Sequence, residues 1–430
     1  MLTSWRLRKT AWGSVLSLAL VAAQCEAQTD FQGATHMIPF DEDAFGYGKA
    51  VATDVVARLQ ARLDKGEVKL TYDEHAGYLP SVLEALKVPR SSQMLVFSKT
   101  SFQRERISPR SPRALFFNDD VYIGFIAGSP LLEVSAADPR LGAVFYTFSQ
   151  QTNARPRFIR NDQCLECHAS AKSLGVPGHL LRSFATDEDG VVDPGSGTSL
   201  VNHRTPLAER WGGWYVTGKS GRQAHRGNLF GKAALAKHEQ EPVASDLEDL
   251  KRFLDLGRYP APHSDIVALM VLEHQTHMHN FITRLNYEAT MALQTYGHLN
   301  YLRNVVEAFL KYLLFTEETA QTGGIQGSST FAKEFADRGP RDKQGRSLRD
   351  FDLQTRLFKY PCSYLIHSEA FNALPEKMKA HLYQKLWDIL RSRDTNPAFE
   401  KLTSADRQAI LEILRDTKPD LPDYWKDAGK

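Results

Sequence analysis

Residues 121–148 read VYIGFIAGSPLLEVSAADPRLGAVFYTF, and this stretch decides the fold of the N-terminal half of the chain. It contains short runs rich in β-branched and aromatic residues, separated by turn-forming residues at Gly128-Ser129-Pro130 and at Asp138-Pro139. A similar run at 94–97 and a turn at 118–120 precede it. Such punctuated runs are typical of neighbouring antiparallel strands. The sequence therefore predicts an antiparallel sheet in this region.

Helical patterns flank the predicted sheet. Apolar residues recur at intervals of three and four over residues 46–65, and Gly66 follows as a stop signal. After about residue 245 the pattern is helical almost throughout, with Ser264 as N-cap of a helix reaching about Leu293 and 403–406 as a capping box. We expect an α+β fold: a mixed α+β part at residues 28–240, with the antiparallel sheet, followed by an α-helical domain at residues 245–430.

The first 27 residues have the pattern of a secretory signal peptide. Arg6, Arg8 and Lys9 precede an uncharged, mostly apolar stretch at 12–23, and Cys25-Glu26-Ala27 resembles a cleavage site. The apolar stretch of about 12 residues is shorter than the roughly 20 that a membrane span requires. A lipoprotein signal at Cys25 is an alternative. We expect a periplasmic or secreted protein with no integral membrane span after signal removal.

The charge balance limits the class of partner. Removing residues 1–27 takes three basic and one acidic residue from totals of 53 and 51, which leaves 50 of each. A neutral chain argues against a general binder of nucleic acid or of membrane surfaces.

The expected sheet leads directly into NDQCLECHAS at 161–170, which contains a C-x-x-C-H motif at Cys164, Cys167 and His168. Random placement of the chain's cysteines and histidines would give this pattern only about 0.001 times. Two thiols at this spacing can each add to one vinyl group of a haem, and the next histidine can ligate the iron. The motif therefore predicts one covalent haem c with His168 as proximal iron ligand.

Other uses of the two cysteines are less favoured. A structural zinc site needs four ligands, and the sequence holds no second C-x-x-C pair. A redox dithiol would need a βαβ pattern that is missing here. Cys362, the third cysteine after signal removal, is interpreted as a buried free thiol, with a cross-link to another chain as the alternative.

At these residues the chain resembles c-type cytochromes in the broad sense. Other runs resemble exported bacterial mono-haem proteins with a CxxCH motif, and they lie at 117–122, 161–168, 209–215 and 264–270. The resemblance implies a covalent haem and export but no particular activity. Small class I cytochromes c carry a distal methionine, whereas no methionine occurs here between His168 and Met270.

Histidine is therefore the expected distal ligand type. Four histidines follow the motif in a segment rich in glycine: His179, His203, His225 and His238. We favour His225, because Gly227 allows close backbone approach and an aromatic cluster at 211–215 precedes it. His203 is second and His179 third.

The helix beginning near Ser264 offers competing candidates. His274 and Met278 share a face that could reach the haem, and Glu273 with His277 could bind a second metal. The favoured interpretation of His274 and Met278 is that they are core residues of a helix between the two parts.

Basic residues near the motif are candidates to pair with the haem propionates or to dock an acidic redox partner. They are Arg155, Arg157, Arg160, Lys172 and Arg182. A solvated charged surface is an equally good interpretation.

Taken together, these patterns predict a periplasmic c-type cytochrome that transfers single electrons between redox partner proteins. A haem c redox enzyme of peroxidase type and a haem-based sensor are alternatives, the sensor suggested by a possibly PAS-like sheet. A zinc-binding protein is the least favoured. Whether the chain is an enzyme stays open.

Overall fold

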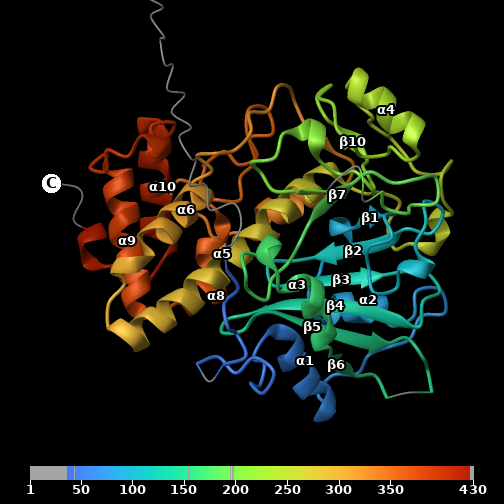
Figure 1. Ribbon diagram of the computed structural model, residues 1–430, viewed down its shortest axis with the longest axis horizontal. Coiled ribbons are helices and arrows are strands. Elements are labelled where there is room, and N and C mark those ends of the chain that lie inside the picture. The colour runs from blue at the N-terminus through green and yellow to red at the C-terminus, as the bar shows by residue number, and fades with distance from the viewer. Residues whose placement is uncertain (1–35, 43, 154, 194, 196–197, 427–430) are drawn as a thin grey trace, which may run out of the picture. The chain divides into compact units, whose positions relative to one another are not determined.

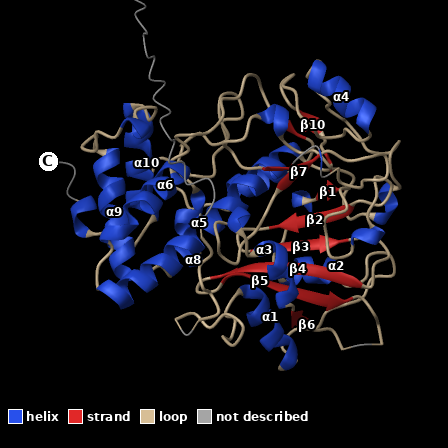
Figure 2. Ribbon diagram, viewed as in Figure 1, coloured by secondary structure: helices blue, strands red, loops and turns tan. Residues whose placement is uncertain are grey.

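The computed structural model describes residues 36–426, except positions 43, 154, 194 and 196–197 (Figure 1). The expected signal peptide at 1–27 lies outside these residues. Residues 31–430 group into one compact unit. Figure 2 shows the strands gathered in one part of the unit and most helices in another. The expected α+β class is therefore confirmed.

The main sheet has seven strands in the order β6-β5-β4-β3-β2-β1-β9, and every neighbouring pair is antiparallel. The strands are β1 (Met94–Val96), β2 (Arg113–Phe117), β3 (Val121–Phe125), β4 (Leu131–Asp138), β5 (Gly142–Ser149), β6 (Phe158–Arg160) and β9 (Trp214–Tyr215). The antiparallel sheet predicted from residues 94–148 is thus confirmed. The PAS-like comparison stays a prediction.

Local side chains form the turns between these strands. The Asn118 side chain accepts hydrogen bonds from the backbone of Asp120 and Val121, which closes the β2–β3 turn. The Asp138 carboxylate likewise accepts from Arg140 and Leu141 before β5 begins. These are the turn residues that separated the runs in the sequence.

The two faces of the sheet differ in what covers them. Side chains alternate along β4, so that Leu132, Val134 and Ala136 are fully buried and the intervening residues are half-buried. The buried face packs against α1 (Val55–Asp64) and α2 (Leu79–Ala85) in one apolar cluster. The other face, which includes Glu133, Ser135 and Phe145, is the one that meets the C-x-x-C-H segment.

Two predicted helix starts need correction. The helix expected from residue 46 begins at Val55, because the Asp54 side chain accepts from the backbone of Val56 and Ala57. The long helix α5 (Ile266–Tyr296) is capped by Asp265 and not by Ser264. The Ser264 hydroxyl instead donates to the Tyr215 carbonyl. In both cases an aspartate lies at the cap position, where its carboxylate accepts hydrogen bonds from the first free backbone amides of the helix.

The remaining helices follow one another along the C-terminal part. They are α6 (Arg303–Leu313), α7 (Phe331–Asp337), α8 (Glu369–Asn372), α9 (Glu376–Leu390) and α10 (Ser404–Thr417), with α3 (Leu165–His168) and α4 (Lys232–Gln240) earlier in the chain. The capping box predicted at 403–406 is confirmed at the start of α10. No helix in the described part of the chain is both long and apolar enough to cross a membrane.

Backbone pairing crosses the expected boundary near residues 240–248. Strand β10 (Gly218–Lys219) pairs with β11 (Gln326–Gly327), and Thr217 bridges to both Leu247 and Asp265. Residues on both sides of this boundary belong to the same compact unit.

Candidate functional site

The C-x-x-C-H motif forms a single helical turn in front of the half-buried sheet face. Asn161 caps a short 3-10 turn at Asp162–Cys164, which runs directly into α3. Residues three and four positions apart share one side of a helix, so Cys164 lies on the same side as Cys167 and His168. Figure 1 shows this turn over the middle of the sheet. Cys164 is half-buried, Cys167 is exposed, and both are free thiols.

His168 is held in one tautomer by the backbone. Its Nδ1–H donates to the carbonyl oxygen of Gly178 over 3.0 Å, because a carbonyl can only accept. The Nε2 atom therefore carries the lone pair that a metal ion needs. The ring packs against Phe145, with centroids 4.8 Å apart. Burial lowers the pKa of His168, which keeps the imidazole neutral near pH 7.

Two charged side chains from the sheet lie beside the motif. Arg113 of β2 and Glu133 of β4 form an ion pair of 2.7 Å, and both act electrostatically on Cys164 and His168. The guanidinium lies over Gly124, where a Cβ atom would meet it at 2.4 Å. Burial, reinforced by Glu133, raises the pKa of the Cys164 thiol to about 11. Sequence reasoning missed this pair, because nothing in the sequence near Arg113 points to the motif.

The predicted basic residues have varied surroundings. Arg160 binds the carbonyls of Tyr47 and Ala50 and pairs with Asp162, so it joins backbone segments. Arg155 pairs with Asp64 at the surface, and Arg157 and Lys172 are exposed. Arg182 lies over the Phe184 ring and interacts with Cys167. Arg182 therefore interacts electrostatically with a cysteine of the motif.

His179 lies close to His168, and both rings pack against Phe145. It follows Gly178, whose carbonyl binds Nδ1, and in an imidazole Nδ1 and Nε2 point to nearly opposite sides. The His179 ring packs on Tyr122 at 4.4 Å, and its Nδ1 faces the Ser135 hydroxyl at 3.4 Å. Burial lowers the pKa of His179 well below its usual value. Its Nε2 is buried and has no hydrogen-bond partner among the described residues.

The favoured distal ligand, His225, has other partners. Its Nδ1 accepts from the Gly227 backbone amide at 3.1 Å, and its Nε2 faces the Asp246 carboxylate at 3.4 Å. It is fully buried and packs against Trp211. Both ring nitrogens are thus engaged within residues 211–246. The preference for His225 stays a prediction, and these contacts do not support it.

The second choice, His203, is buried against His274 of α5. Its Nδ1 lies 2.9 Å from Nδ1 of His274, whose Nε2 lies 2.8 Å from the Ser363 hydroxyl. Both rings stack on Tyr312. His238 is buried within α4. None of these contacts includes a residue of the motif.

The metal site suggested at Glu273 and His277 is not assembled. The Glu273 carboxylate pairs with Arg210 and accepts from the Trp211 indole N–H at 3.1 Å. His277 Nε2 instead faces the Arg204 guanidinium at 3.2 Å. Among the described residues, no three or more His, Cys, Asp or Glu side chains are arranged to hold a metal ion.

Other predicted candidates are core residues. Met278 is fully buried in the apolar cluster around α5, as the favoured interpretation held. Cys362 is a buried free thiol, as expected, and burial strongly raises its pKa.

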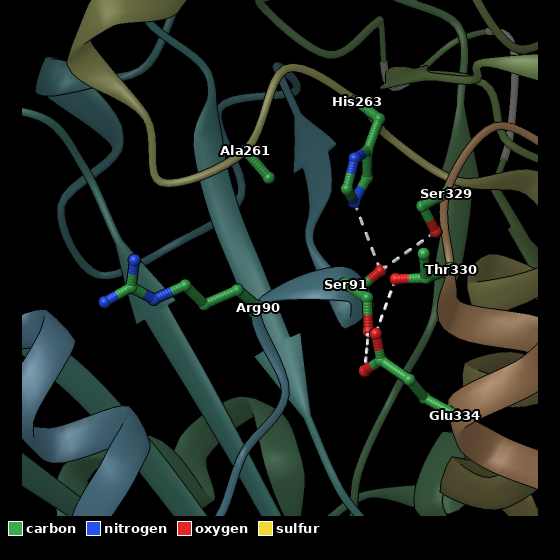
Figure 3. A pocket seen from close by; sticks show the side chains of 7 residues that line it. All are labelled: Arg90, Ser91, Ala261, His263, Ser329, Thr330 and Glu334. Carbon is green, nitrogen blue, oxygen red and sulfur yellow. Dashed lines mark hydrogen bonds between the residues drawn. The ribbon is translucent and has the colours of Figure 1, made fainter. Parts of the chain in front are cut away.

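A cavity of about 370 Å³ lies elsewhere, between 90–91, 261–263 and the start of α7 (Figure 3). The Glu334 carboxylate accepts hydrogen bonds from the hydroxyls of Ser91 and Thr330, at 2.6 and 2.5 Å. His263 donates through Nε2 to the Ser91 carbonyl at 3.2 Å. These polar groups satisfy one another, and none belongs to the motif.

Comparisons with protein-family models, with curated proteins and with solved structures found no match.

Proposed function

We propose that this protein is a c-type cytochrome that binds one haem covalently and transfers single electrons between redox partner proteins. Cys164 and Cys167 would hold the haem through thioether bonds, and His168 would ligate the iron. The observation that carries the proposal is the hydrogen bond from Nδ1–H of His168 to the Gly178 carbonyl. It leaves Nε2 available on the helical turn that presents both thiols.

The residues present fit a haem in three further respects. The thiols are free, and one is exposed and accessible to an attachment enzyme. Phe145 supplies an apolar contact for the proximal ring. The Arg113–Glu133 pair and Arg182 place fixed charges beside the site. Such charges and hydrogen bonds are the means by which a protein tunes a haem.

A bound haem supplies a metal that takes up and releases one electron at a time. The chain's own part is to hold the haem, to fix the ring of His168 and to exclude water from the side of the haem that faces the protein. Covalent attachment of this kind also agrees with the export predicted from residues 1–27. We therefore place the mature protein in the periplasm or outside the cell.

A second candidate is a haem enzyme of peroxidase type or a haem-based sensor. The observation that favours it is the set of contacts of the histidines after the motif: His179 packs on Tyr122, while His203 and His225 contact other groups. An iron without a histidine on its distal side would accept a small ligand there. High-spin ferric iron that binds cyanide readily would favour this candidate over the electron carrier.

The test is a pyridine haemochrome spectrum of the mature protein, produced together with the haem-attachment machinery. A c-type spectrum that persists after acid-acetone extraction is expected. If the purified protein retains no haem, the proposal is wrong, and metal analysis would then show whether the same cysteines bind zinc.

A further inference from the structure

One asparagine of α5 holds the backbone segment that orients the proximal histidine. The backbone N–H of His179 donates to Oδ1 of Asn280 over 2.8 Å, and Nδ2 of Asn280 donates to the His179 carbonyl over 2.7 Å. Asn280 is only 1% exposed. A side-chain amide that pairs with both backbone groups of one residue fixes that residue as a neighbouring strand would.

The residue before His179 carries the contacts to the motif. The backbone N–H of Gly178 donates to the His168 carbonyl at 2.8 Å, and the Gly178 carbonyl accepts from His168 Nδ1 at 3.0 Å. The packing here is close, since a Cβ atom at Gly178 would lie 2.3 Å from Oδ1 of Asn280. On its other side, the Pro177 carbonyl accepts from Ala143 of β5 at 3.0 Å. The segment is thus clamped between α5 and the sheet.

We propose that Asn280 is the positioning residue of the proximal side, which keeps the Gly178 carbonyl in line with Nδ1–H of His168. This inference rests on the proposed function, since it concerns the ligand of the haem iron. A hydrogen bond at Nδ1 fixes the tautomer and orientation of a ligating imidazole and raises its basicity at Nε2. A more basic ligand stabilises the ferric state. Asn280 therefore lowers the reduction potential, although it lies 101 residues from His179 in the chain.

The experiment compares three variants of the haem-loaded, full-length mature protein: Asn280→Ala, Asn280→Ser and the control Asn286→Ala. Asn286 is on the same helix, and its amide reaches only the carbonyls of residues 139–140. The midpoint potential is measured by spectroelectrochemical titration. The exchange of the His168 Nδ1 proton with solvent is followed by NMR in each protein, the unsubstituted one included.

Asn280→Ala is expected to shift the equilibrium toward the reduced form by about tenfold, a rise of about 59 mV for one electron, and to speed proton exchange. Asn280→Ser replaces the amide by a single hydroxyl that can still make one hydrogen bond, and it should shift the potential less. Asn286→Ala should leave both readouts unchanged.

Each outcome either supports or contradicts the role proposed for Asn280. Covalent haem with equal potentials and equal exchange in the Asn280 variants would overturn the role of Asn280 and leave the proposed function intact. A protein without covalent haem would overturn both. If Asn280→Ala does not fold, the change of midpoint potential in Asn280→Ser tests the role of Asn280 instead. If neither variant accumulates, a rapidly exchanging Nδ1 proton in the unsubstituted protein contradicts the inference and a protected one supports it.

Discussion

The segment 161–179 and the segment 198–247 both supply buried or half-buried histidines, yet these histidines differ in what determines their environment. In the first, the two thiols and the imidazole share one helical turn, so their relation follows from sequence spacing alone. In the second, His203 and His225 each find partners that the spacing does not indicate. Local spacing therefore determines how the three motif side chains lie relative to one another, and it does not determine the partners of His203 and His225.

The two segments also differ in how the ring nitrogens of their histidines are hydrogen-bonded. His168 has one nitrogen engaged by a carbonyl, which leaves the other for chemistry. His225 has both engaged, which is the usual state of a buried structural histidine. Hydrogen bonding alone does not single out a ligand candidate, since the buried Nε2 atoms of His179 and His203 also have no hydrogen-bond partner among the described residues.

The largest expected effect is on the first segment. Replacing Cys164 and Cys167 together by Ser should abolish covalent haem, because no thiol remains to form a thioether. Haem content after acid-acetone extraction measures this directly. Cys362→Ala is the matched control and should retain all its haem, since Cys362 is buried and distant in sequence. Equal haem in the double variant would remove the distinction between the two segments.

In the second segment the largest effect should be on stability. Arg210→Ala would leave the Glu273 carboxylate buried without its partner, and burial already raises the pKa of Glu273 to about 7. Breaking a buried pair in this way costs about 3–5 kcal/mol. Urea unfolding measures the loss. The control Arg155→Ala removes an exposed pair with Asp64 and should cost below about 1 kcal/mol. A similar loss in both variants would contradict the prediction.

Acid should destabilise the protein through two buried histidines of α5, His274 and His279. Burial lowers the pKa of His279 to about 4 and of His274 to about 3, whereas unfolded histidine titrates near 6.5. The unfolded chain therefore binds protons that the folded chain does not, and stability is lost as the pH falls from about 6.5 toward 4. For His279 alone the loss is about 3 kcal/mol.

The measurement is the free energy of unfolding between pH 7 and pH 4.5. His279→Gln removes one of these groups, so its stability should fall less steeply with falling pH than that of the unsubstituted protein. Parallel curves for the two proteins would show that His279 is not a buried neutral group.

The smallest expected effect concerns His225. Replacing it by Ala removes hydrogen bonds to Gly227 and Asp246 and should cost about 1–3 kcal/mol. The absorption spectrum of the haem should stay the same, because no contact of His225 includes a residue of the motif. A changed low-spin spectrum would restore His225 as distal ligand and weaken the contrast between the two segments.

Much of the fold followed from local patterns. The turn residues at 118–120 and 138–139 separated strands that pair as predicted, and the capping box at 403–406 starts α10. The errors concerned the first residues of α1 and α5. There Asp54 and Asp265, and not nearby residues, occupy the N-cap positions. Cap choice depends on which side chain the local backbone brings to the free amides, and periodicity does not report that.

By itself, the sequence determined the antiparallel strands, the helical C-terminal part and the C-x-x-C-H turn, because each depends on residues within a few positions of one another. Only the tertiary structure decided that Gly178 orients His168, that Asn280 clamps the 178–179 backbone and that Arg113 and Glu133 lie beside Cys164. Apart from the contact between His168 and Gly178, these contacts join segments far apart in the chain. Their geometry is fixed by the packing of α5 and the strands, which no local pattern encodes.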